Sequence, residues 1–168
     1  MSIDLEINGL QVRLGDPEGP AALRQAGFRS PPVWRRLLLR DSDRSRWVAN
    51  NCTVTAWDGA LSLYPCIDRY LNHDRRWQTR AGLVYAAGCL EEVSFEVIEG
   101  KYAAPNYFDL FQDLCSRDLG DPLHHNGRLV WKNGRALAEG ELSLDGLNAL
   151  FHWRLAAADP GASHPGAR

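Results

Sequence analysis

The histidines of the C-terminal half are the first residues whose types could do chemistry. His124 and His125 are adjacent, Asp121 precedes them, and His152 lies further along the chain. Imidazole and carboxylate groups bind zinc, so Asp121, one histidine of the pair and His152 could form a metal site. However, adjacent residues of an extended segment point to opposite sides, and no His-x-x-x-His spacing or second carboxylate completes a ligand set. The sequence therefore predicts no metal, and we expect the histidine pair in an exposed loop before a strand.

A second cluster begins at His73 and Asp74 and continues through Arg75, Arg76 and Trp77. An aspartate directly after a histidine cannot orient that histidine in the usual way, and no serine or cysteine lies in a recognisable nucleophile motif. These observations argue against catalysis here. Arginine and tryptophan are enriched among the residues that dominate protein interfaces, so Arg75, Arg76 and Trp77 are predicted to form a recognition patch.

Three carboxylates, Glu91, Glu92 and Glu96, lie close together. Apolar residues alternate with the last two, which places Glu92 and Glu96 on the polar face of a predicted strand. Solvated acids are ordinary on such a face. A hydrolase site around His73 and Glu92 remains an alternative.

The cysteines and the glycines indicate no further chemistry. Cys52, Cys66, Cys89 and Cys115 lie far apart without a Cys-x-x-Cys pair, and we expect buried, reduced thiols. The chain has no glycine-rich phosphate loop and no dinucleotide fingerprint. The sequence therefore predicts no cofactor and favours a protein that is not an enzyme.

The elements that would position these residues begin with an N-terminal hairpin. Apolar residues alternate on both sides of Asn8-Gly9, a pair typical of tight hairpin turns. The predicted pairs are Ile7 with Leu10, Leu5 with Val12 and Ile3 with Leu14 on one face, and Asp4 with Arg13 on the other. A short helix over residues 20–26 should follow and end at Gly27.

A strand is predicted over residues 33–40, followed by a hairpin that turns at Asp58-Gly59. Its expected pairs are Val54 with Leu63 and Ala56 with Leu61. This register would place Cys66 opposite Asn51, which argues against a disulfide between Cys52 and Cys66. Residues 66–80 are interpreted as a connecting loop, with one helical turn as an option.

The second half is predicted to hold strands in residues 82–88 and 93–100, a helix over 105–119 and a three-stranded meander over 128–155. Turns at Asn133-Gly134 and Asp145-Gly146 would define the meander. The expected pairs are Trp131 with Ala136, Leu129 with Ala138, Leu142 with Ala149, Gly140 with Phe151, and Ala138 with Trp153. Gly140 would make room for Phe151 and for a side chain of the helix.

These elements predict an α+β fold of antiparallel hairpins and meanders with one helix per half, in a duplicated ββαβββ order. The first half would span residues 1–65, the connector 66–80 and the second half 81–157, and residues 158–168 would form a disordered tail. We expect these parts to make one compact unit.

The charge distribution is asymmetric although the net charge is only −2. Residues 29–80 contain ten arginines and five acids, whereas residues 81–168 contain seven basic residues and twelve acids. The outer ridge of the predicted helix, Asp109, Gln112 and Asp113, would suit a basic protein partner. The Arg75, Arg76 and Trp77 patch would suit an acidic partner instead. Arginine content alone does not indicate nucleic-acid binding.

No stretch of the sequence has the roughly 18 apolar residues of a membrane span, and the acidic opening is unlike a secretory leader. We therefore expect a cytoplasmic protein without a membrane partner.

Three segments carry a resemblance to known proteins: "VTAWDGALSLYP", "NYFDLFQDLCSRDLGDP" and "GRLVWKNGRALAEGELSLDGLNALFHWRL". They resemble uncharacterised small bacterial cytosolic proteins, some of which are immunity partners of secreted antibacterial toxins. The tandem helix-on-sheet order is also similar to the beta-lactamase-inhibitor-protein architecture. Neither resemblance supplies catalytic residues.

Together, these observations predict a protein-binding module of the immunity type, which neutralises a toxin by direct binding. Two alternatives remain open: a small-molecule or lipid-binding domain that uses an aromatic-lined sheet, and the hydrolase considered above.

Overall fold

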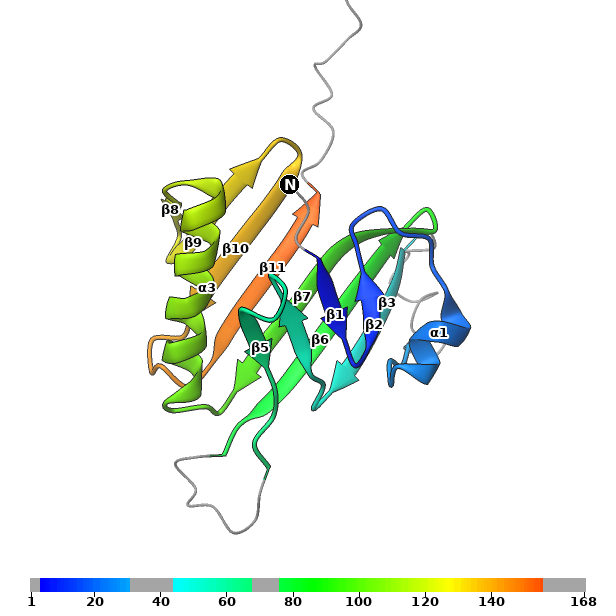
Figure 1. Ribbon diagram of the computed structural model, residues 1–168, viewed down its shortest axis with the longest axis horizontal. Helices are drawn as coiled ribbons and strands as arrows, with labels where there is room; N and C mark the ends of the chain where they lie inside the picture. Colours follow the sequence, from blue (N-terminus) through cyan, green and yellow to red (C-terminus); the bar gives the residue numbers. More distant parts are fainter. Residues whose placement is uncertain (1–3, 31–43, 68–75, 156–168) are drawn as a thin grey trace, which may run out of the picture.

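The computed structural model describes residues 4–30, 44–67 and 76–155 and shows the predicted α+β fold with two antiparallel sheets (Figure 1). The smaller sheet has the order β2-β1-β4-β5, with bounds Leu10–Val12, Leu5–Ile7, Val54–Ala56 and Leu61–Leu63. The larger sheet has the order β3-β6-β7-β11-β10-β9-β8, with bounds Arg44–Asn50, Gln78–Ala86, Cys89–Ile98, Ala149–Leu155, Ala136–Leu142, Arg128–Asn133 and Leu123–His125. The helices are α1 (Pro20–Gln25) and α3 (Ala103–Leu119).

Helix α3 and the smaller sheet cover the same face of the larger sheet. The helix lies over β9 and β10, and the smaller sheet lies over β6 and β7 (Figure 1). Buried side chains from both layers form one hydrophobic cluster, in which Trp131, Phe151 and Leu83 are almost fully enclosed. None of the described elements covers the opposite face of the larger sheet, where polar residues alternate with the buried ones.

Both predicted hairpins of the first half are confirmed. In the first, Leu5 pairs with Val12 and Ile7 with Leu10, and Arg13 Nε lies 3.0 Å from Asp4 Oδ1. In the second, Val54 pairs with Leu63 and Ala56 with Leu61. Alternation specified these registers because a shift of one residue would expose the whole apolar face.

The first turn also connects distant segments. Asn8 adopts a positive φ of 50°, as expected at a tight turn. Its side-chain amide donates a hydrogen bond of 2.8 Å to the carbonyl of Ala26 and accepts one of 2.9 Å from the backbone of Thr53. The same asparagine therefore shapes the hairpin and attaches it to the end of α1 and to the start of β4.

The predicted register of the meander is right at one turn and wrong at the other. Leu142 pairs with Ala149 and Gly140 with Phe151, as predicted. Between β9 and β10, however, Trp131 pairs with Ala138 rather than with Ala136. The turn consists of Gly134 and Arg135, with Gly134 at a φ of 59°, because glycine takes the first position of the turn. The shift is two residues, so each side chain keeps its predicted face.

Three further strand predictions need correction. Strand β3 was not anticipated, while the predicted strand 33–40 lies outside the described residues. Strand β6 begins at Gln78, inside the predicted connector, and Cys66 bridges to Trp77 rather than to Asn51. The histidine pair lies in β8, not in a loop. Asn126 and Gly127, with φ values of 49° and 77°, turn β8 back onto β9.

The predicted main helix is confirmed and begins two residues earlier, at Ala103. It ends at Leu119, and Gly120 follows with a φ of 87°. Phe111 packs edge-on against Trp131, with ring centroids 5.8 Å apart. A Cβ at Gly140 would lie 3.3 Å from the Phe111 ring, so this glycine does make room for a helix side chain.

The sheets do not divide at the boundary between the predicted halves, because β3 joins the larger sheet. Two side chains connect the smaller sheet and its turn to α3: Trp57 Nε1 donates to Asp118 at 2.8 Å, and the Tyr107 hydroxyl donates to the Ser62 carbonyl at 2.9 Å. The duplicated ancestry of residues 1–65 and 81–157 stays a prediction, and the predicted tail lies outside the described residues.

Candidate functional site

The outward-facing side of the larger sheet holds the densest group of interacting charged side chains, and we call it the open face. Strand pairing arranges its residues in rows that cross the sheet. Ser94, His152 and Glu139 are successive cross-strand neighbours on β7, β11 and β10. The acidic, basic and histidine residues of the open face are Arg44, Arg46, Arg80, Glu91, Glu92, Glu96, His125, Arg128, Lys132, Glu139, Glu141, His152 and Arg154.

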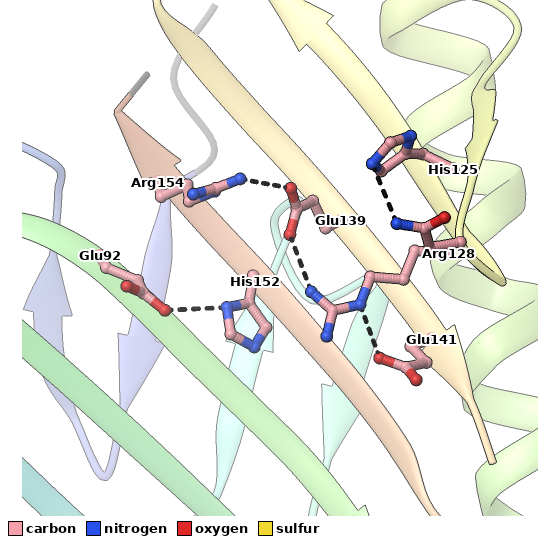
Figure 2. Close-up of polar contacts among 8 residues, drawn as sticks. Glu92, His125, Arg128, Glu139, Glu141, His152 and Arg154 are labelled. Atoms are coloured by element: carbon pink, nitrogen blue, oxygen red, sulfur yellow. Dashed lines mark hydrogen bonds and ion pairs between the residues drawn. The ribbon is translucent and has the colours of Figure 1, made fainter. Parts of the chain in front are cut away.

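Glu92 and His152 form the central polar pair (Figure 2). His152 Nδ1 lies 2.8 Å from Glu92 Oε1, and both side chains are about three-quarters buried. The hydrogen bond from His152 lowers the pKa of Glu92, with smaller contributions from Arg154 and Arg46, and partial burial opposes this shift. The pair therefore holds a carboxylate and an imidazole in a fixed relative orientation.

Glu139 is the most buried acid of this surface, with 7% of its surface exposed. Arg154 Nη2 donates to one of its oxygens at 2.7 Å, and Arg128 Nη1 lies 3.9 Å from the other (Figure 2). Arg128 also donates to Glu141 at 2.8 Å. A buried carboxylate requires partners of this kind, because desolvation without them is costly.

Two more ion pairs lie towards the opposite edge of the sheet. Arg80 Nη1 lies 2.9 Å from Glu96 Oε1, and its Nε donates to Asn50 at 3.2 Å. Arg44 lies 3.0 Å from Glu91, which is the extra residue of a β-bulge opposite Val84 and Tyr85. All five glutamates of the open face thus have a partner. Among the described residues, Arg46 and Lys132 form no ion pair.

Ser94 lies next to the Glu92–His152 pair, which raises the question of a serine nucleophile. The geometry argues against it. A Cβ built on Gly82 would lie 2.7 Å from Ser94 Oγ, so this hydroxyl leans towards β6. His152 lies on β11, on the other side of β7. A base must reach the proton that it removes, and no hydrogen bond joins these two described residues.

The residues considered as metal ligands in the sequence do not form a cluster among the described residues. In the described part of the chain no group of three or more histidine, cysteine, aspartate or glutamate residues could hold a metal ion. His152 is bound to Glu92, whereas His125 contacts Asn126 at 3.3 Å near the β8 edge (Figure 2). His73, the other half of the hydrolase alternative, lies outside the described residues.

The predicted partner-binding residues of α3 lie away from the open face. Asp109 and Asp113 are exposed on α3 and Gln112 is half-buried, on the helix that covers the other face of the sheet. Trp77 is half-buried, and its Nε1 donates to the Tyr64 carbonyl at 2.6 Å. Arg76 is half-buried, and Arg75 lies outside the described residues.

All four cysteines are free thiols, but they are not all buried as predicted. Cys52 and Cys115 are enclosed, and burial raises the pKa of both thiols. Cys66 is half-buried, and Cys89 is exposed at the start of β7. Alternation did not predict the exposure of Cys89. The β-bulge adds one residue to β7 and so changes the face on which the first residues of this strand lie.

The aromatic residues and a cavity beside α1 bear on the small-molecule alternative. Phe95, Phe111 and Phe151 pack against one another in the core, so these rings are not available to a ligand. A cavity of about 390 Å³ lies beside α1 instead, lined by Arg24, Gly27, Phe28, Arg29, Ser30 and Trp47. The Arg24 guanidinium lies 5.6 Å from the centre of the Trp47 ring at this cavity.

Sequence reasoning missed the open face as a site. Alternation predicts that Glu92 and Glu96 lie on a polar strand face, but it does not identify their partners, His152 on β11 and Arg80 on β6. The signal that could have found His152 is alternation in β11, where His152 and Arg154 alternate with the apolar residues Phe151 and Trp153.

No protein-family model, no curated protein and no solved structure matches the chain. Among the helices of the described residues, none is long and apolar enough to span a membrane.

Proposed function

We propose that the chain is a protein-binding module of the immunity type, which neutralises a bacterial toxin by covering a functional surface of that toxin. One observation carries this proposal: a broad sheet face is left uncovered by the described elements, and its charged side chains are held by cross-strand ion pairs. A rigid, polar surface of this kind fits stable binding to another protein, because little side-chain freedom is lost on association.

The arrangement of polar groups supports binding rather than turnover. Among the described residues, no hydrogen bond joins the Glu92–His152 pair to the neighbouring Ser94 hydroxyl, and the other ion pairs of the open face are spread over several strands. Catalysis needs groups that converge on a reacting atom, whereas binding needs groups that are spread over a surface. The open face has the second arrangement.

The resemblance to immunity partners of secreted toxins supports the identity of the bound protein. Inhibition by occlusion requires shape and charge complementarity and no chemistry in the inhibitor. The acidic ridge of Asp109, Gln112 and Asp113 and the Arg75, Arg76 and Trp77 patch are the rival surfaces for the same function.

The test is co-expression with the product of the adjacent gene, where a toxin partner would be encoded. We expect a stoichiometric complex on size-exclusion chromatography and protection of cells against the toxic product. Free migration of both proteins together with loss of growth would contradict the proposal. A matched control is co-expression with an unrelated toxin, which should not be neutralised.

A second candidate is the binding of a small molecule in the cavity beside α1. Two arginines and a buried indole there would suit an aromatic anion, because guanidinium groups bind carboxylates and stack on rings. Native mass spectrometry after mild purification would test this. A bound small molecule that is lost in Arg24→Ala would favour this candidate over the first.

A further inference from the structure

The exposures of paired side chains on the open face differ in one consistent direction. In each of the arginine–glutamate pairs there, the arginine is the more exposed member. The contrast is largest for Arg128 and Glu139, whose side chains are 47% and 10% exposed. Glu139 therefore lies close to the sheet, and in every pair the guanidinium group is the member that a partner would meet first.

Two further cations add to this layer. Arg46 and Lys132 are exposed and form no ion pair with a described residue. They lie on β3 and β9, on the same side of the sheet as the paired arginines. The open face thus has positive groups outermost across its width, although its acids and bases are similar in number.

We propose that the open face binds an acidic surface of a protein partner. This inference rests on the proposed function and specifies the charge of the partner. Carboxylates of the partner would bind the outer edges of guanidinium groups that the underlying glutamates already hold in position, which lowers the entropy lost on binding.

A protein fits this surface better than a nucleic acid does. Apolar side chains lie among the charges, including Val48 and Leu123, which are 37% and 68% exposed at the two edges of the sheet. Mixed apolar and arginine-rich composition is typical of protein interfaces. The glutamates beneath the arginines would also repel closely spaced phosphates, and phosphate binding needs uncompensated cations.

The experiment uses the full chain and three probes: a fluorescent polyglutamate peptide, a polylysine peptide of equal length and single-stranded DNA of equal charge. We expect polyglutamate to bind most tightly, with affinity that falls as salt is added. Backbone amide NMR shifts should change along β3, β7, β9 and β11 and should not change along α3.

The variant is Arg46→Ser with Lys132→Ser, which leaves every glutamate of the open face with its ion pair. We expect it to weaken polyglutamate binding about fivefold, since two exposed charge contacts are lost. The matched control is Arg13→Ser with Lys101→Ser, which also removes one arginine and one lysine, after β2 and before α3, and should bind nearly as the parent protein does. Amide spectra would verify that both variants are folded.

Tighter binding of polylysine or of DNA would overturn the inference, and so would equal losses in the two double variants. These outcomes are distinguishable from failure of the proposed function. If the toxin complex forms but polyglutamate does not bind the open face, only the inference fails. If polyglutamate binds as expected and no protein complex forms, only the proposed function fails.

Discussion

At the scale of single residues, the open face owes its order to partners that lie on different strands. Glu92 and His152 are far apart in sequence, and only the pairing of β7 with β11 brings them within 2.8 Å. Alternation predicts that Glu92 faces outward, but it cannot specify which side chain lies beside it. The sequence therefore predicts the face of the sheet on which Glu92 lies, but it does not predict the ion pair that Glu92 forms.

The Glu92–His152 pair predicts a pH dependence of stability. The hydrogen bond from His152 lowers the pKa of Glu92 in the folded protein, so the folded state binds this proton less tightly than the unfolded chain does. The resulting stabilisation is complete above the ordinary glutamate value of about 4.3 and is lost as the pH falls through the lower folded value.

We expect Glu92→Gln to reduce the free energy of unfolding by about 0.5–1 kcal/mol near neutral pH, with a smaller difference below about pH 4. Urea unfolding at several pH values would measure this. A carboxyl NMR titration should place the pKa of Glu92 below the ordinary value. A constant difference between variant and parent at all pH values would refute the assignment.

The cysteines provide a second residue-scale prediction. Iodoacetamide should modify exposed Cys89 first, because burial both shields the Cys52 and Cys115 thiols and raises their pKa. Protein purified without reductant and then denatured should take up four alkyl groups by mass spectrometry. A disulfide between Cys52 and Cys66, or modification of Cys115 before Cys89, would contradict the structure.

At the scale of elements, sequence reasoning succeeded where a turn and a one-sided apolar pattern agreed. The hairpins at Asn8-Gly9 and Asp58-Gly59 have the expected pairs. It failed at Asn133-Gly134, because that dipeptide fits a turn either as both central residues or with glycine as the first of them. The two choices differ by two residues in register, and both bury the same side chains, so hydrophobicity does not discriminate between them.

The predicted boundaries of β6 and β7 were wrong for a related reason. The turn between β6 and β7 consists of Ala87 and Gly88, with φ values of 50° and 76°. Alanine rarely adopts this conformation, so residue type gave little indication of the turn. Strand β3 likewise follows an arginine-rich stretch that resembles a solvated loop, and only its pairing with β6 shows that it belongs to the larger sheet.

The contact between α3 and the sheet predicts the effect of one substitution. Gly140→Val would bring a Cβ to 3.3 Å from Phe111 and 3.4 Å from Phe108, with two further methyl groups to accommodate. We expect a loss of about 1–3 kcal/mol in the free energy of unfolding, because overpacking strains a filled core. Leu150→Val, on the open face, is the control and should cost less. Equal stability of Gly140→Val and the parent protein would contradict the packing.

At the scale of the whole molecule, the two layers give the protein two surfaces of opposite character. The acidic ridge of Asp109, Gln112 and Asp113 lies on α3, and the arginine layer of the open face lies on the far side of the larger sheet. The sequence predicted the charge asymmetry along the chain. It did not predict this separation, because β3 from the first half lies in the same sheet as strands from the acidic half.

The most direct test of the central claim is the association rate of the chain with its protein partner, measured at several salt concentrations for two pairs of substitutions. Our account predicts that Arg46→Ser with Lys132→Ser slows association and flattens its salt dependence, because electrostatic attraction to an acidic partner is reduced. Asp109→Lys with Asp113→Lys should leave both quantities nearly unchanged. The opposite pattern, in which only the substitutions on α3 slow association, would contradict the account and would place the interface on the acidic ridge.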